Sequence, residues 1–215
     1  MISYSIKEGL NGNPVIPGDK SISHRSIIIP SISNGVCEIN NILKSEDVLH
    51  TLNAFKSMGV QIKEKEKKIT VFGKGLNSLK EPKKSIYLGN SGTSARLLTG
   101  LLSSQPFRSI LKGDESLSKR PMERISDPLS KMNARINTTN GSLPLMIEGS
   151  KLIPSEIELQ IPSAQIKSGL LLASLNIIGE TKIIENSITR DHTEIMLESF
   201  RANIEIEKKD GKKLI

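Results

Sequence analysis

The sequence predicts an α/β (α+β) fold built from one unit, strand–helix–strand–helix–strand–strand, that occurs three times. The first observation behind this prediction is a cationic residue that recurs at an even spacing. Arg25, Arg96 and Lys167 lie 71 residues apart. The second observation is that apolar segments of matching type occur at similar offsets from each cation. We therefore expect three related units at about 14–80, 84–150 and 155–215.

The first half of each unit can be followed from its apolar segments. A short strand is expected about ten residues before each cation, at Val15, Ile86 and Ile157. An apolar helical run follows each cation, at residues 27–29, 97–102 and 170–175. A second strand is expected at residues 36–42, 107–112 and 181–185.

The second half of each unit starts with an amphipathic helix and ends in a hairpin. The helix ends lie at residues 52–58, 129–132 and 197–200, with apolar residues three apart. Alternating strands then begin at Val60, Ala134 and Ala202. The dipeptides Asn140-Gly141 and Asp210-Gly211 favour tight hairpins, and return strands are expected at 69–72 and 143–147. The third return strand is expected to be cut by the chain end at Ile215, and residues 1–13 have no counterpart in the unit.

Composition excludes several functional classes. Aromatic residues make up 3% of the chain and Trp is absent, which argues against a surface of stacked bases. Cys37 is the only cysteine, so an intrachain disulfide is excluded, and the three histidines show no metal-ligand spacing. No apolar run is long enough to cross a membrane, and the first residues do not resemble a secretory signal. A cytoplasmic location is expected.

The net charge of +7 is compatible with a solvated basic surface or with anionic ligands. The first helix of each unit starts with small or hydroxyl residues, and helix N-termini bind anions through free N–H groups. A cation there opposes the helix dipole, so a bound anion or a buried carboxylate partner is expected beside it. We favour an anion at Arg25, whereas Arg96 and Lys167 could instead fix the repeats together.

A glycine-rich turn at residues 89–93 (Gly-Asn-Ser-Gly-Thr) lies between a strand and a helix, and its backbone can approach a phosphate closely. Arg120-Pro121 is expected to open the second helix of the middle unit, because Pro suits the first helical position. Arg120 is then expected to face the glycine-rich turn.

Five motifs resemble, in order, the signatures of the 5-enolpyruvylshikimate-3-phosphate (EPSP) synthase family. They are residues 17–25 (Pro-Gly-Asp-Lys-Ser-Ile-Ser-His-Arg), 89–97 (Gly-Asn-Ser-Gly-Thr-Ser-Ala-Arg-Leu), 113–122 (Gly-Asp-Glu-Ser-Leu-Ser-Lys-Arg-Pro-Met), 163–168 (Ser-Ala-Gln-Ile-Lys-Ser) and 189–194 (Thr-Arg-Asp-His-Thr-Glu). The resemblance implies transfer of the enolpyruvyl group of phosphoenolpyruvate to the 5-hydroxyl of shikimate 3-phosphate, with release of phosphate, on the route to chorismate and aromatic amino acids.

The same resemblance implies one lobe of the enolpyruvyl transferase fold, with pseudo-threefold symmetry, helices inside and sheets outside. Family members have two such lobes, so residues 1–13 are expected to belong to a missing second lobe and residues 14–215 to the first. The family uses no metal or organic cofactor, and the full-length protein is expected to be a monomer. In family members the carboxylate base and further cationic residues belong to the second lobe, at positions beyond residue 215. This chain alone is therefore expected to bind substrate without turnover.

The resemblance assigns site residues position by position. Lys20 matches a catalytic lysine between the two substrates. Shikimate 3-phosphate is assigned to Lys20, Ser21, Arg25, Ser163, Ala164, Gln165 and Arg190. Phosphoenolpyruvate is assigned to Lys20, Gly92, Arg120 and Gln165. Ser21 and Ser163 could also be plain helix caps, and His24 is expected to be packed or capping.

Two other functions remain open. The sister family of UDP-N-acetylglucosamine enolpyruvyl transferases shares the repeat, but it does not share Gly-Asp-Lys-Ser or Ser-Ala-Gln and carries a loop cysteine far from Cys37. A non-enzymatic basic module that binds nucleic acid is allowed by the charge, but the few aromatics argue against it.

Overall fold

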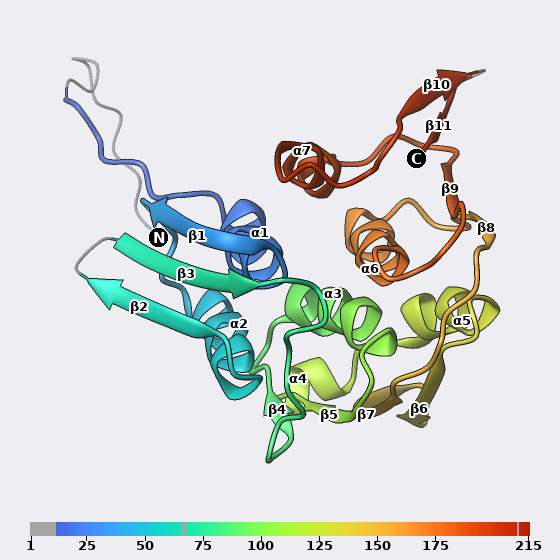
Figure 1. Ribbon diagram of the computed structural model, residues 1–215, viewed down its shortest axis with the longest axis horizontal. Helices are drawn as coiled ribbons and strands as arrows, with labels where there is room; N and C mark the ends of the chain where they lie inside the picture. Colours follow the sequence, from blue (N-terminus) through green and yellow to red (C-terminus); the bar gives the residue numbers. More distant parts are fainter. Residues whose placement is uncertain (1–11, 66–67, 210) are drawn as a thin grey trace, which may run out of the picture.

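The computed structural model describes residues 12–65, 68–209 and 211–215, and it contains three related units (Figure 1). Each unit contributes one sheet and its helices. The sheets lie on the outside of the molecule, and α1, α3 and α6 lie on its inner side. The predicted α/β architecture with internal helices and outer sheets is confirmed.

The first unit contains two helices and an antiparallel sheet in the order β1-β3-β2. Its elements are α1 (Lys20–Ser31), β1 (Asn34–Asn40), α2 (Glu46–Ser57), β2 (Gln61–Lys65) and β3 (Lys68–Lys74). Apolar residues of α1 and α2, such as Ile28 and Phe55, are fully buried.

The second unit has a four-stranded sheet in the order β4-β5-β7-β6, in which β4 is parallel to β5. Its elements are β4 (Ile86–Tyr87), α3 (Gly92–Ser103), β5 (Arg108–Lys112), α4 (Glu115–Ser118), α5 (Glu123–Lys131), β6 (Arg135–Thr139) and β7 (Ser142–Glu148). Asn140 and Gly141 both adopt positive φ between β6 and β7, as the predicted hairpin requires.

The third unit repeats this plan, with strand order β10-β11-β9-β8 and β8 parallel to β9. Its elements are β8 (Glu156–Glu158), α6 (Ala164–Ser174), β9 (Lys182–Glu185), α7 (His192–Ser199), β10 (Glu207–Lys209) and β11 (Lys212–Leu214). Gly211 has the positive φ expected of the hairpin, whereas Asp210 lies outside the described residues.

Three local predictions were wrong. No strand forms at residues 15–17, where Val15 is 88% exposed, because Pro14 and Pro17 lack the N–H groups that a ladder uses. The strand expected at Ala202 is absent, because β11 is only three residues long and β10 pairs with it from Glu207 onward. The helix expected at Arg120 begins instead at Glu123, since α4 precedes it and Arg120 lies in the turn between them.

Helices α3 and α6 contact each other through their backbones at the centre of the fold. A Cβ atom built on Gly100 would lie 1.9 Å from the carbonyl oxygen of Gly169, and both glycines are buried. Such close approach requires glycine.

Within residues 12–65, 68–209 and 211–215, no helix combines the length and apolar character that a membrane crossing needs. The interpretation of residues 1–13 falls outside the described residues, except for Gly12 and Asn13.

Candidate active site

The N-termini of α1, α3 and α6 are capped by the side chains that the sequence places there. Asp19 Oδ1 accepts from the backbone N–H of Ile22 at 2.8 Å at the start of α1. Ser91 caps α3 and Ser163 caps α6 in the same way, through backbone N–H groups three residues later. The capping alternative for Ser163 is therefore observed, whereas Asp19 takes that role in place of Ser21.

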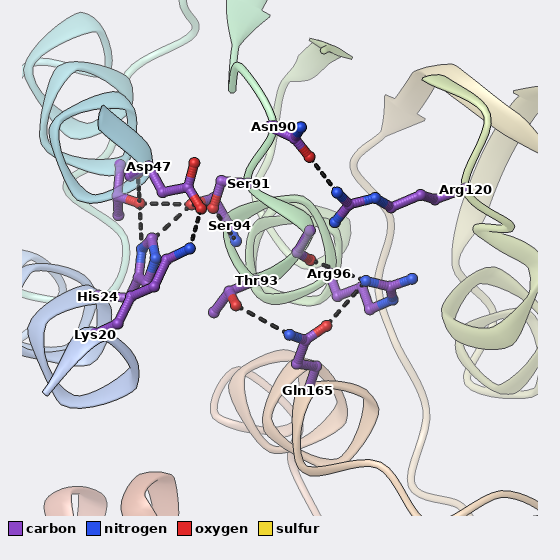
Figure 2. Close-up of polar contacts among 12 residues, drawn as sticks. Lys20, His24, Asp47, Asn90, Ser91, Thr93, Ser94, Arg96, Arg120 and Gln165 are labelled. Atoms are coloured by element: carbon purple, nitrogen blue, oxygen red, sulfur yellow. Dashed lines mark hydrogen bonds and ion pairs between the residues drawn. The ribbon is translucent and has the colours of Figure 1, made fainter. Parts of the chain in front are cut away.

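Figure 2 shows polar side chains from four parts of the chain around the N-terminal end of α3. Lys20 approaches from α1, Gln165 from α6, and Arg120 from the turn between α4 and α5. Three of the predicted site residues thus surround one helix end, where free N–H groups give a positive potential.

Gln165 connects two of the three helix ends. Arg96 Nη1 donates to Gln165 Oε1 at 2.9 Å, and Gln165 Nε2 donates to Thr93 Oγ1 at 3.0 Å. Arg96 Nη1 also lies 3.2 Å from the carbonyl oxygen of Gly92, which accepts from it. Arg96 therefore ties the second repeat to the third, which is one of the two roles that the sequence left open for it.

Arg120 faces the glycine-rich turn, as expected, and donates to Asn90 Oδ1. A Cβ atom on Gly92 would lie 3.0 Å from Arg120 Nη1 and 2.8 Å from Arg96 Nη1. The missing side chain therefore lets two guanidinium groups approach the start of α3 together. Burial, followed by the charges of Arg120 and Arg124, lowers the pKa of Arg96.

Lys20 forms an ion pair with Asp47, in the first turn of α2. Half of the Lys20 side chain remains exposed. Beside this pair, His24 Nδ1 is 2.7 Å from Thr51 Oγ1, whose oxygen is 2.6 Å from Ser94 Oγ. Burial first, then the charge of Lys20, lowers the pKa of His24 to about 4, so this ring is neutral at pH 7.

Arg25 is more enclosed than a ligand-facing cation, being only 3% exposed. Its guanidinium donates to Thr193 Oγ1 at 2.6 Å, to Ser168 Oγ at 2.6 Å and to the carbonyl oxygen of Ser21 at 2.9 Å. Burial is the main cause that lowers the pKa of Arg25 to about 10. Its predicted contact with substrate phosphate stays a prediction.

Arg190 completes the group from the loop before α7. Its Nη1 is 3.3 Å from Ser21 Oγ, which accepts from it, and Arg190 is exposed. Its charge also acts on Arg25 and lowers the pKa of that guanidinium further. Ser21, Arg25 and Arg190 therefore lie together where α1 meets the third unit.

Lys167 does not face this site. It is fully buried and pairs with Glu185 and Glu194, so the buried carboxylate partner that the sequence allowed is present. A groove of about 1110 Å³ is likewise remote from the site. It lies at the C-terminal ends of α1 and α6 and contains none of the predicted site residues.

Several residues that contact the candidate site residues were not identified from the sequence. Asn90 and Thr193 lie inside motifs that were recognised, but nothing in their spacing gave them a role. Asp47 gave no signal beyond an acidic residue in the first turn of a helix, where the dipole alone would favour it.

Comparison with known proteins identifies the family. The profile of EPSP synthase (3-phosphoshikimate 1-carboxyvinyltransferase) matches residues 5–215. The chain belongs to the EPSP synthase family. It is 52% identical over 200 residues to 3-phosphoshikimate 1-carboxyvinyltransferase of Ruthia magnifica, covering 93% of this chain and 46% of that protein. It is 47% identical over 209 residues to the protein of the same name from Streptococcus mutans, covering 96% and 48%.

The fold agrees with solved structures of this family. EPSP synthase from Acinetobacter baumannii superimposes with a TM-score of 0.89 at 46% identity, covering 95% of this chain and 46% of that one. The chain spans about half the length of the curated relatives it matches.

Proposed function

We propose that this chain is one lobe of a two-lobe EPSP synthase. The complete enzyme would transfer the enolpyruvyl group of phosphoenolpyruvate to the 5-hydroxyl of shikimate 3-phosphate and release phosphate. The observation that carries the proposal is the set of cations around the N-terminal end of α3, together with membership of the family (Figure 2).

Shikimate 3-phosphate would bind where α1 meets the third unit. Its phosphate would accept from the hydroxyls of Ser21 and Ser163, from the N–H groups that begin α6 at Ala164 and Gln165, and from Arg190. Among the described residues, three of the five N–H bonds of Arg25 donate to protein oxygens, and the other two would donate to the phosphate.

Phosphoenolpyruvate would bind on the other side of Gln165, at the start of α3. Gly92 leaves room for a phosphate against the backbone, and Arg120 would pair with it. Both substrates carry a phosphate and a carboxylate, and removing these four groups from water requires paired cations.

Lys20 would act between the two substrates as a catalytic residue. In the reaction the enol carbon is protonated, the 5-hydroxyl attacks, and the tetrahedral intermediate loses phosphate. A fixed ammonium stabilises charge that develops in this sequence. His24 is buried and neutral, so it is assigned a structural role, and the proton-transfer groups are assigned to the second lobe.

The proposal also covers the protein as a whole. Residues 14–215 would form the first lobe and residues 1–13 would belong to the second, in a monomeric cytoplasmic enzyme. The missing lobe would supply the remaining cations, so the chain alone would bind shikimate 3-phosphate without turnover.

Calorimetric titration of the 215-residue chain with shikimate 3-phosphate tests the proposal. We expect saturable binding that Arg190→Gln weakens about tenfold, because a charge-assisted contact is lost. Arg108→Gln, in an exposed ion pair with Glu148, is the matched control and should leave binding unchanged. Parallel titrations with UDP-N-acetylglucosamine and with random duplex DNA at physiological salt test the two alternatives.

Binding of either alternative ligand in preference to shikimate 3-phosphate would overturn the proposal. Phosphate release from phosphoenolpyruvate and shikimate 3-phosphate should appear only when the second lobe of a relative is added. Turnover by the chain alone would contradict the assignment of the proton-transfer groups to that lobe.

A further inference from the structure

Four charged side chains lie together inside the third unit and are buried from solvent. This buried ion cluster consists of Lys167, Glu185, Glu194 and Lys213, each with a side chain no more than 3% exposed. Lys167 Nζ lies 2.7 Å from Glu185 Oε2 and 2.7 Å from Glu194 Oε1. Lys213 Nζ lies 2.9 Å from the same Glu194 oxygen.

The cluster joins every layer of the third unit. Lys167 is on α6 and Glu194 on α7, whereas Glu185 and Lys213 face each other across the ladder between β9 and β11. The two helices are therefore tied to each other and to the sheet through charged groups. The distance between α6 and α7, and their rotation about their axes, depend on these contacts.

Stability is a poor explanation for this cluster. Burying ions costs free energy that their attraction often only balances, and apolar residues of similar size are frequently as stable or more so. Glu194 Oε2 is buried without a hydrogen-bond partner among the described residues, which adds to the cost. A role in placing neighbouring groups explains the charges better.

The groups that the cluster places are two hydroxyls. Ser168 follows Lys167 on α6, and Thr193 precedes Glu194 on α7. Their hydroxyl oxygens are 2.6 Å apart, and the Arg25 guanidinium donates to both, at 2.6 Å each. Each residue of the Lys167–Glu194 ion pair is therefore adjacent in sequence to one of the two hydroxyl side chains that accept from Arg25.

Toward the C-terminal ends of α1 and α6, a groove of about 1110 Å³ lies between α1 and the third unit, and Ile29, Leu171 and Leu197 help to line it. Figure 1 shows α1 on one side of this separation and α6 with α7 on the other. The register between the two sides is therefore set mainly at the level of Arg25.

We propose that Lys167 and Glu194 are positioning residues for the ligand site. The buried ion cluster fixes α6 against α7, so that Ser168 and Thr193 hold the Arg25 guanidinium next to Ser21 and Arg190. Neither Lys167 nor Glu194 touches a ligand. The effect on shikimate 3-phosphate rests on the proposed function, whereas the placement of Arg25 does not.

The double variant Lys167→Met/Glu194→Leu tests the proposal. It removes one charge of each sign and leaves Glu185 and Lys213 to balance each other. We expect a cooperative unfolding transition to be retained and the affinity for shikimate 3-phosphate to fall about tenfold. We also expect the Arg25 Nε–H signal in ¹⁵N NMR to exchange with water at least tenfold faster.

The matched control is Lys56→Met/Glu64→Leu, an ion pair of 2.8 Å between α2 and β2 that is partly exposed and away from Arg25. It should change neither the Arg25 signal nor the affinity. A folded Lys167→Met/Glu194→Leu protein with unchanged exchange and unchanged affinity would overturn the proposal, because a merely structural cluster predicts that result.

Two further outcomes are also decisive. If the double variant does not fold, Glu194→Gln takes its place, since the amide oxygen still accepts from Lys167. Glu194→Gln removes the negative charge that both Lys167 and Lys213 contact, so we expect faster Arg25 Nε–H exchange with intact far-ultraviolet dichroism. Unaltered Arg25 exchange in that folded variant would overturn the proposal. If the unmodified chain binds no shikimate 3-phosphate, the proposed function fails, and the Arg25 exchange still decides this inference.

Discussion

The third unit meets the rest of the described chain at two interfaces, or seams, that are built in different ways. Against the second unit, α6 meets α3 through glycine, and the two backbones touch at Gly100 and Gly169. Against the first unit, α6 and α7 meet α1 through Arg25 and two hydroxyls, with an open groove below. Close backbone packing fixes the first seam, with the hydrogen bonds of Gln165 to Arg96 and Thr93 at its end, whereas directed polar contacts of a buried guanidinium fix the second. The helix spacing that places Gln165 should therefore depend on packing, and the placement of Arg25 on charge and hydrogen bonding.

Gly100→Ala should break the glycine seam and give the largest effect. The new Cβ would lie 1.9 Å from the Gly169 carbonyl oxygen, so the two helices must move apart. We expect the free energy of unfolding to fall by about 3 kcal/mol or more, measured by urea denaturation.

Asn53→Ala is the control for this change, because Asn53 is an exposed position in the middle of α2. Alanine there should be neutral or slightly stabilising, since it favours helix and meets no neighbour. If Gly100→Ala proved as stable as Asn53→Ala, the contrast between the two seams would be lost.

The sequence was sufficient to predict the strong, local features. Hairpin turns, capped helix starts and apolar runs each follow from a few neighbouring residues, so the three units and most of their strands were predicted. Two of the three errors are strands, which depend on a pairing partner as well as on their own residues. Val15 and Ile16 have strand character, but no ladder in the described chain receives them. Ala202 similarly lacks an opposing strand, because β11 is short.

The site residues also divide into those with local sequence signals and those whose surroundings depend on the tertiary fold. Gly92, Arg120 and Gln165 were selected from motifs and lie together; Gly92 and Gln165 are at helix starts that carry local signals, and Arg120 lies in the turn between α4 and α5. The enclosure of Arg25 could not be foreseen, since its partners Ser168 and Thr193 are 143 and 168 residues away. The partner of Lys20 was missed for the same reason, because the contact with Asp47 depends on how α2 packs against α1.

The seam between the first two units tests whether a polar seam responds to pH. His24 is buried there against Thr51, and its pKa is lowered to about 4 from 6.5. Between these values the unfolded chain binds more protons than the folded one, so stability should rise with pH from 4 to 6.5. The contribution of His24 should approach about 3 kcal/mol over this window and be fully present above pH 6.5.

Urea denaturation at several pH values should show this dependence, and His24→Gln should flatten it. His192→Gln, at the partly exposed start of α7, is the control and should keep the slope of the unmodified protein. The slopes are compared rather than the absolute stabilities, because His24→Gln also disturbs the Thr51 contact. An equal slope in His24→Gln would show that another group controls the pH dependence.

The smallest expected effect comes from an ion pair that lies outside both seams. Lys56–Glu64 and Lys167–Glu194 have nearly the same N–O distance, 2.8 and 2.7 Å, but the first is partly exposed and the second fully buried. Water screens the exposed pair, so a double-mutant cycle with alanine should give a coupling free energy of about 0.5 kcal/mol or less. In the buried pair each single substitution leaves an uncompensated charge, and losses of about 3–5 kcal/mol are expected. Their coupling should therefore be several times larger.

High salt should reduce the coupling of Lys56–Glu64 and leave that of Lys167–Glu194 almost unchanged, because screening ions do not reach a buried pair. Similar couplings for both pairs would mean that water enters the buried ion cluster, and the polar seam would then lack the fixed geometry assigned to it.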